Sequence, residues 1–253
     1  MKITENIFII GSGNFGLSHE TDCNVYLIGS GDQFAIIDCG SGICSDIIIN
    51  NVLNEGIKKE WIKYLILTHS HWDHAGGCHA IAKAFNCKIC AHKMAFAKLN
   101  EYKNAELSAV VDEQKRDIPN DIEISGSTEI NLNDVTLRFM YTPGHSPDSI
   151  SVYGLFGCGI SLFCGDTAAA CGKIGVISNK TNLEQYTESI KTLYELNSNA
   201  LFPGHGIFTL KNSTIHLQLT YEKMKSSWYE VFPTPTPFNP SWWNNYYSKL
   251  TKI

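Results

Sequence analysis

Short apolar runs separated by turn residues recur along the first part of the chain. Residues 7–10, 25–28 and 34–37 each predict a strand. Residues 29–32 (GSGD) join the last two strands and predict a hairpin turn. The chain is therefore expected to start with short, buried strands of an antiparallel arrangement.

Further along the chain, apolar residues at helical spacing alternate with more short strands. Helices are expected at residues 46–53, 75–85, 183–196 and 213–232, and strands at residues 64–67, 87–91, 135–141, 149–152, 160–164 and 200–202. Gly56 closes the first helix, and Pro233, Pro235 and Pro237 end the last. The polar stretch 92–121 predicts one helix and a loop.

Strands precede helices in both halves of the chain, with hairpins as well as crossovers. This order predicts an α/β fold in which helices cover mixed sheets. A chain of 253 residues can build one sizeable core, and we expect a single domain over residues 1–253.

Composition narrows the classes of protein to consider. The chain is 43% hydrophobic and 18% charged, as in soluble globular proteins, and its net charge of −5 argues against a nucleic-acid surface. No apolar run approaches the roughly 20 residues that span a bilayer, so no membrane partner is expected. Nine cysteines, an odd number without an export signal, predict reduced thiols and a cytoplasmic location.

Residues 68–77 (THSHWDHAGG) carry the strongest chemical signal. Side chains of an extended segment alternate, so His69 and His71 point to the same side. Asp73 and His74 follow where the chain turns into the next predicted helix. One segment can therefore offer two groups of ligands, and imidazole with carboxylate suits zinc, iron or manganese.

Three later segments repeat one pattern, in which His or Asp follows a predicted strand beside a glycine. They are residues 142–146 (TPGHS), 164–167 (CGDT) and 202–206 (FPGHG). Glycine lets the backbone turn sharply and approach a ligand closely. These segments add His145, Asp166 and His205 as candidate ligands.

Together these motifs resemble those of the metallo-β-lactamase superfamily, in particular its glyoxalase II-like hydrolases. The resemblance covers about residues 1–210 and includes residues 24–28 (NVYLI) and 36–40 (IIDCG). It implies a four-layer αβ/βα sandwich with two mixed sheets and metals at one edge. Residues 211–253, which hold nine aromatic side chains, would then form a C-terminal extension.

The resemblance also implies a role for each candidate residue in holding two divalent ions, zinc first and iron or manganese as alternatives. The implied ligands are His69, His71 and His145 for one ion, Asp73, His74 and His205 for the other, and Asp166 between them. Asp38 would lie behind the ligands and orient the histidine-rich loop.

The implied activity is that of a binuclear metallo-hydrolase. Bound divalent ions can lower the pKa of water from 15.7 to about 7, and the metal-bound hydroxide would cleave a small ester, thioester or lactone. Asp73 is the candidate catalytic residue, because it would lie close enough to the water to relay a proton.

Two alternatives on the same fold remain open. A persulfide dioxygenase would hold a single iron through the positions of His69, His145 and Asp166. An acyl-homoserine-lactone lactonase shares the whole motif set. A diiron flavoprotein usually has Glu where this chain has His71, and a nuclease usually carries a further binding domain, so both are disfavoured.

The substrate is the least determined feature. The partner is expected to be a small molecule, but the aromatic extension departs from the glutathione-binding pattern of glyoxalase II enzymes. It could pack on the sandwich, wall a substrate pocket or form a homodimer contact. Lys173 follows a Cys-Gly pair as in those enzymes, but its spacing from Asp166 is shorter, so its role is not transferred.

Overall fold

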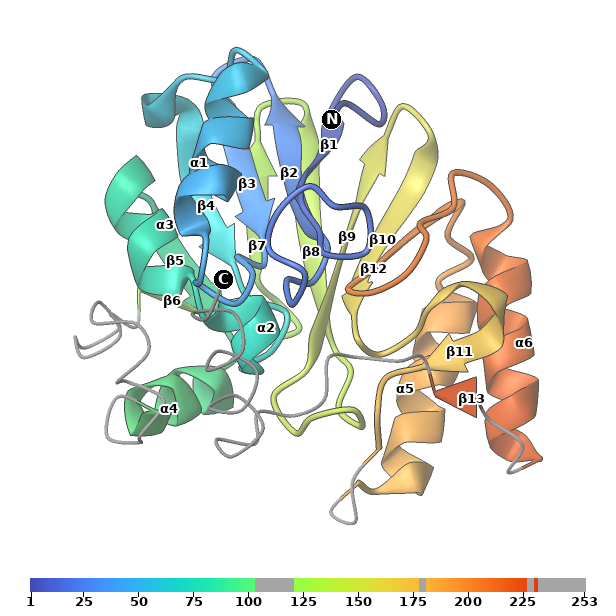
Figure 1. Ribbon diagram of the computed structural model, residues 1–253. Helices are drawn as coiled ribbons and strands as arrows, with labels where there is room; N and C mark the ends of the chain where they lie inside the picture. The colour runs from blue at the N-terminus through green and yellow to red at the C-terminus, as the bar shows by residue number, and fades with distance from the viewer. Residues whose placement is uncertain (103–120, 178–180, 227–229, 232–253) are drawn as a thin grey trace, which may run out of the picture.

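Two β-sheets face each other across the centre of the molecule, and helices cover the outer face of each (Figure 1). The computed structural model describes residues 1–102, 121–177, 181–226 and 230–231. The predicted four-layer αβ/βα sandwich of two mixed sheets is confirmed.

The first sheet has six strands in sequence order, antiparallel at its first two pairings and parallel from β3 onward. They are β1 (Ile7–Gly11), β2 (Val25–Ser30), β3 (Gln33–Ile37), β4 (Ile62–Ile66), β5 (Lys88–Ala91) and β6 (Ile122–Glu123). The predicted hairpin joins β2 and β3, where Gly31 has a φ of 59° that favours glycine.

The second sheet has five strands in the order β12-β10-β9-β8-β7. They are β7 (Glu129–Leu132), β8 (Val135–Tyr141), β9 (Ile150–Phe156), β10 (Gly159–Gly165) and β12 (Ala200–Pro203). Because β9 is antiparallel to both β8 and β10, and β10 is parallel to β12, three strands run the same way. Their carboxyl ends therefore meet at one edge of the sheet.

The alternation of side chains along the strands divides the core into separate layers. In β1, Ile7 and Ile9 pack between the two sheets, whereas Phe8 and Ile10 pack under the helices of the first sheet. In β10, Phe163 likewise points between the sheets, and its neighbours point toward the helices of the second sheet. Strands that are apolar on both faces explain why the sequence shows continuous apolar runs.

Helices cover each outer face, as Figure 1 shows. They are α1 (Ser45–Asn54) and α3 (Cys78–Phe85) on the first sheet, α5 (Leu183–Glu195) and α6 (Ser213–Lys225) on the second, and α2 (Trp72–Ala75) and α4 (Lys93–Tyr102) near the lower edge. Apolar side chains spaced along α5, Tyr186, Ile190 and Leu193, are buried against the second sheet.

Two helix predictions need correction. The helix expected at residues 75–85 begins later, as α3 at Cys78, and a separate short helix, α2, ends at Ala75; at Gly76 and Gly77 between them, a Cβ would overlap the backbone of Ser41 and Cys39. The helix expected at residues 213–232 ends at Lys225, and β13 (Glu230–Val231) instead pairs with β11 (Lys173–Ile174). Local helical spacing cannot report either tertiary contact.

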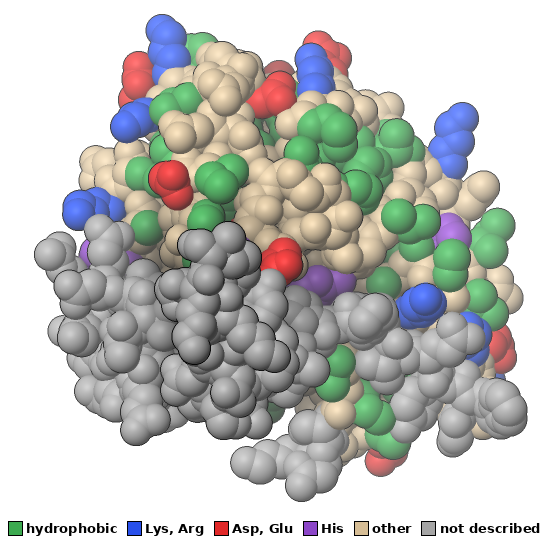
Figure 2. All heavy atoms as spheres, viewed as in Figure 1, with side chains coloured by type: hydrophobic (Ala, Val, Ile, Leu, Met, Phe, Trp, Pro, Cys, Tyr) green, Lys and Arg blue, Asp and Glu red, His purple; other side chains and the backbone are tan. Residues whose placement is uncertain are grey.

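The polar stretch 92–121 contains the predicted helix, α4, whereas the predicted loop falls mainly on residues 103–120, outside the described part. Of the C-terminal extension predicted at residues 211–253, the structure describes residues 211–226 and 230–231, and the rest lies outside the described part. On the face drawn in Figure 2, described lysines and acidic side chains are interspersed, and a histidine reaches the surface near the centre. In the described residues, no helix is long and apolar enough to span a membrane.

Candidate metal centre

The histidine-rich segment begins where β4 ends, at the edge of the first sheet. Asp38, which follows the parallel neighbour β3, accepts hydrogen bonds from the Thr68 backbone N–H (2.8 Å) and hydroxyl (2.8 Å). The other end of the segment turns into α2, and its His74 Nδ1 lies 2.8 Å from Asp38 Oδ2. Asp38 is almost fully buried, and it holds both ends of the segment.

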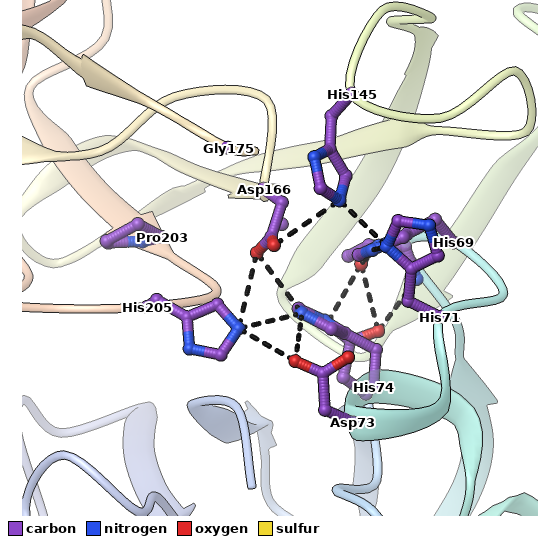
Figure 3. Close-up of polar contacts among 12 residues, drawn as sticks. His69, His71, Asp73, His74, His145, Asp166, Gly175, Pro203 and His205 are labelled. Atoms are coloured by element: carbon purple, nitrogen blue, oxygen red, sulfur yellow. Dashed lines mark hydrogen bonds and ion pairs between the residues drawn. The ribbon is translucent and has the colours of Figure 1, made fainter. Parts of the chain in front are cut away.

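Three imidazoles meet on one side of the segment, as Figure 3 shows, and we name them the three-histidine cluster: His69, His71 and His145. His71 Nδ1 lies 3.0 Å from His69 Nε2 and 2.8 Å from His145 Nε2. His145 is supplied by the loop after β8, and its Nδ1 lies 3.0 Å from the carbonyl oxygen of Val176. That contact orients Nε2 toward the cluster.

Asp73, His74 and His205 gather beside it, and we name them the acidic cluster. His205 Nε2 lies 3.0 Å from Asp73 Oδ2 and 3.3 Å from His74 Nε2. His205 follows β12, and the carbonyl oxygen of Gly204 accepts a hydrogen bond from the Asn24 backbone N–H. This bond ties the β12 loop to the start of β2 in the first sheet.

Asp166 lies between the two clusters, after β10. Its Oδ1 is 3.1 Å from His74 Nε2, and its Oδ2 is 3.4 Å from His145 Nε2. A Cβ on Gly204 would overlap Asp166 Oδ1 and His74, so the close approach requires glycine there. The Tyr186 hydroxyl contacts the Asp166 carbonyl oxygen at 3.1 Å and fixes the loop from behind.

This donor set fits divalent metal ions. Several imidazole nitrogens point at one another at hydrogen-bond distance, although a neutral imidazole has only one N–H to donate. Oδ1 of Asp166 is buried and accepts no well-formed hydrogen bond from the described residues. Cations shared between these nitrogens and carboxylates would satisfy both groups, and nitrogen with oxygen donors is the ligand type of zinc and related ions.

The two clusters differ in their protonation. Burial, with added repulsion from His145, lowers the pKa of His71 to about 4, and burial lowers the pKa values of His69 and His145 as well. Burial also opposes a charge on His74, but the facing thiol of Cys23 and three carboxylates raise its pKa well above 6.5. The three-histidine cluster is therefore neutral, whereas His74 is protonated without a metal.

The carboxylates are held in their charged form. Burial would raise the pKa of Asp166, but the imidazoles of His205, His74 and His145 hold it well below its ordinary value of 3.8. The pKa of Asp73 is also lowered, because His74 and His205 outweigh its burial.

All seven candidate ligands come together, and Asp38 lies behind His74. Lys173 is not among the candidate ligands, but together with His205 it lines a pocket of about 260 Å³. Sequence reasoning missed Asp148, which is fully buried and accepts a 2.7 Å hydrogen bond from the Ser70 backbone N–H. The only sequence feature that pointed to Asp148 is its position three residues after the candidate ligand His145.

Comparisons with known proteins agree with this geometry. The family model described as the metallo-beta-lactamase superfamily matches residues 20–205. An atrochrysone carboxyl ACP thioesterase of Aspergillus fumigatus is 28% identical over 195 residues, 77% of this chain and 54% of that protein. A hydroxyacylglutathione hydrolase of Francisella tularensis subsp. novicida is 27% identical over 176 residues, 68% of this chain and 62% of that protein.

The chain thus spans little more than half the length of these curated relatives. Among solved structures, a subclass B3 metallo-beta-lactamase of Bradyrhizobium japonicum superposes with a TM-score of 0.70 at 20% identity, covering 90% of each chain. That likeness shows the fold, and the family model covers well over half of the sequence, including all seven candidate ligands. The chain belongs to the metallo-beta-lactamase superfamily.

Proposed function

We propose that the protein is a metal-dependent hydrolase that holds two divalent ions, zinc first, and cleaves a small thioester, ester or lactone. The observation that carries the proposal is the convergence of two adjoining ligand clusters that share the carboxylate of Asp166. The names of two relatives, a thioesterase and a hydroxyacylglutathione hydrolase, favour a thioester among these substrates.

Two bound ions would supply an activated water at neutral pH and polarise the substrate carbonyl. The chain's own groups have separate tasks. The Asp73 carboxylate lies in the acidic cluster, 3.0 Å from His205 Nε2, where it could relay a proton from the attacking water. With an ion bound, Asp38 would keep the remaining proton of His74 on Nδ1, so that Nε2 could face the ion.

The pocket beside His205 is the proposed substrate site. Its lining includes the apolar Ala169, Ala170 and Ile207, together with Lys173 and Asn14. Asn14 Oδ1 accepts a hydrogen bond from the Gly206 N–H, which holds the β1–β2 loop against the residue after His205. A volume of about 260 Å³ suits a small acyl group rather than a macromolecule.

All nine cysteines are unpaired, which supports a reducing compartment, and we propose the cytoplasm. The small-molecule partner and the homodimer contact remain predictions. The interspersed charges of Figure 2 support a small-molecule substrate over a nucleic acid.

The test is metal removal followed by reloading. Protein freed of metal with a chelator should lose hydrolysis of a lactoyl thioester and regain it as about two zinc ions per chain bind. An acyl-homoserine lactone and an aryl ester, assayed in parallel, separate thioesterase from lactonase and esterase. A single iron per chain, with oxygen consumed on a persulfide substrate and no hydrolysis, would contradict the proposal and favour the dioxygenase.

A further inference from the structure

An ion pair between the buried Asp148 and the partly exposed Lys98 lies beside the segment that carries His69 and His71. Asp148, in the loop between β8 and β9, has no exposed surface. Its Oδ1 accepts a 2.7 Å hydrogen bond from Lys98 Nζ on α4, and its Oδ2 accepts a 2.7 Å hydrogen bond from the Ser70 backbone N–H. Burying a carboxylate without a partner would lower the stability of the fold. The hydrogen bonds from Lys98 and Ser70 offset that cost.

The Asp148 carboxylate joins the two segments that supply the cluster. Ser70 stands between His69 and His71, and Asp148 stands three residues after His145. The bond from the Ser70 N–H therefore fixes the backbone of the first segment relative to the second. A backbone bond from the Ile150 N–H to the Thr68 carbonyl oxygen (2.8 Å) runs beside it and keeps the same register.

Lys98 supplies the charge that lets the carboxylate stay ionised while buried. Burial would raise the pKa of Asp148, but the bond and charge of Lys98 and the bond from Ser70 lower it. A second contact also holds α4. The ring of His92, just before the helix, stacks on the ring of Tyr141, with the ring centroids 4.8 Å apart and an angle of 15° between the ring planes. The Tyr141 hydroxyl in turn donates to the Pro147 carbonyl oxygen, next to Asp148.

We propose that Asp148 is a positioning residue for the metal centre, which holds the His69–His71 segment and the His145 loop at the separation that a bound ion needs, with Lys98 as its charge partner. This inference rests on the proposed function, since it presumes an ion at the three-histidine cluster. Metal–ligand distances tolerate only about ±0.2 Å, whereas His71 and His145 come from different sheets. Their 2.8 Å approach depends on contacts between the two segments.

The Asp148→Asn variant tests the idea with almost no change in volume. An amide nitrogen cannot accept a hydrogen bond, so either the Ser70 N–H or Lys98 loses its acceptor. Cobalt reports the site directly through its absorption spectrum. We expect cobalt affinity at the three-histidine cluster to fall about 10- to 100-fold, the usual range for groups that orient ligands, and the cobalt spectrum to change.

Lys98→Met provides a second variant that keeps Asp148 and its bond to Ser70. It should shift affinity and spectrum in the same direction by a smaller factor, and Lys98→Arg should restore both in part. The matched control is Glu129→Gln, which breaks the exposed 2.8 Å pair with Arg138 and should leave cobalt binding unchanged.

The outcomes separate the two proposals. Wild-type affinity and spectrum in folded Asp148→Asn and Lys98→Met, with only their melting temperatures lowered, would overturn the positioning role and leave the proposed function standing. If Asp148→Asn does not fold, Lys98→Met alone decides the question by the same two readouts. Failure of the wild-type chain to take up cobalt or zinc would overturn the proposed function and this inference together.

Discussion

The three-histidine cluster and the acidic cluster adjoin each other, yet they prepare for a cation in different ways. The first contains only imidazoles, kept neutral by burial, so its nitrogens are ready to bind. The second contains one carboxylate, that of Asp73. Against the effect of burial, Cys23 and the carboxylates of Asp166, Asp38 and Asp73 raise the pKa of its His74 well above 6.5. A cation there must displace a proton that the same carboxylates attract, so the two sites should differ in occupancy and pH response.

This difference teaches that one ligand set can serve two tasks. Neutral imidazoles bind an ion without a competing proton over the physiological range. Carboxylates bring negative charge that attracts a second ion. Asp166 contacts both clusters and connects the two environments.

The largest effect is expected from Asp166→Ala, which removes the group shared by both clusters. The imidazoles of His74 and His145 would face each other without an anion between them. Groups that only orient the ligands change metal affinity about 10- to 100-fold, so losing a shared ligand should lower the affinity by more than roughly 100-fold. Elemental analysis should find fewer than one ion per chain, and thioester hydrolysis should be lost.

Two bound ions and normal turnover in Asp166→Ala would contradict this description of a shared carboxylate. Glu129→Gln is a suitable control, because it alters only an exposed ion pair with Arg138. It should retain both ions.

A matched pair, His71→Ala and His205→Ala, separates the clusters. Each variant removes one imidazole, the first from the three-histidine cluster and the second from the acidic cluster. We expect each to lose one ion of two, with turnover lowered about 100-fold, and the remaining cobalt ion to give a different absorption spectrum in each variant. Elemental analysis and cobalt titration measure both results.

Identical spectra and equal loss of both ions in the two variants would mean that the clusters form one site. In that case the comparison between a neutral and an acidic half would fail, even if the protein were still a metallo-hydrolase.

The sequence predicted some of the candidate ligands more directly than others. Four candidate ligands lie within six residues, because one strand end and one helix start supply them, and such a run is visible without any structure. His145, Asp166 and His205 come from three strands that share a direction, and only the repeated strand-to-glycine pattern pointed to them. Resemblance to the superfamily then grouped these residues.

What the sequence could not predict depends on contacts between distant segments. Gly76, between α2 and α3, approaches the backbone of Ser41 closely, and β13 pairs with β11, which lies more than 50 residues away in the sequence. The bond from Lys98 to Asp148 spans 50 residues, and neither residue stands in a recognisable motif. Elements with strong local periodicity, such as α5, were predicted almost to the residue.

A smaller, selective effect is expected from Asp38→Asn. Asp38 contacts His74 Nδ1 in the acidic cluster, whereas its link to the three-histidine cluster runs only through Thr68. Removing its charge should weaken the second ion about 10- to 100-fold and the first ion less. Calorimetric titration with zinc should resolve the two steps, and equal weakening of both would contradict this selectivity.

The smallest effect, and the sharpest test of the comparison, is the response to pH. In metal-free protein His71 has a pKa of about 4 against an ordinary 6.5, so between these values the unfolded chain binds more protons and stability falls as pH falls. The pKa of His74 is raised, so it contributes stability that is present below 6.5 and is lost as pH rises through its folded value.

Metal binding should show the same contrast, because the pKa of His71 is lowered and that of His74 is raised. In His205→Ala, which keeps the three-histidine cluster, cobalt affinity should be nearly constant from pH 8 to pH 6. In His71→Ala, which keeps the acidic cluster, a proton must leave His74 before an ion binds, so affinity should rise with pH over that range. Competition titrations at pH 6, 7 and 8 measure both slopes. If affinity changed equally with pH in both variants, protons would compete with the cation to the same extent at both clusters. The comparison between the three-histidine cluster and the acidic cluster would then fail.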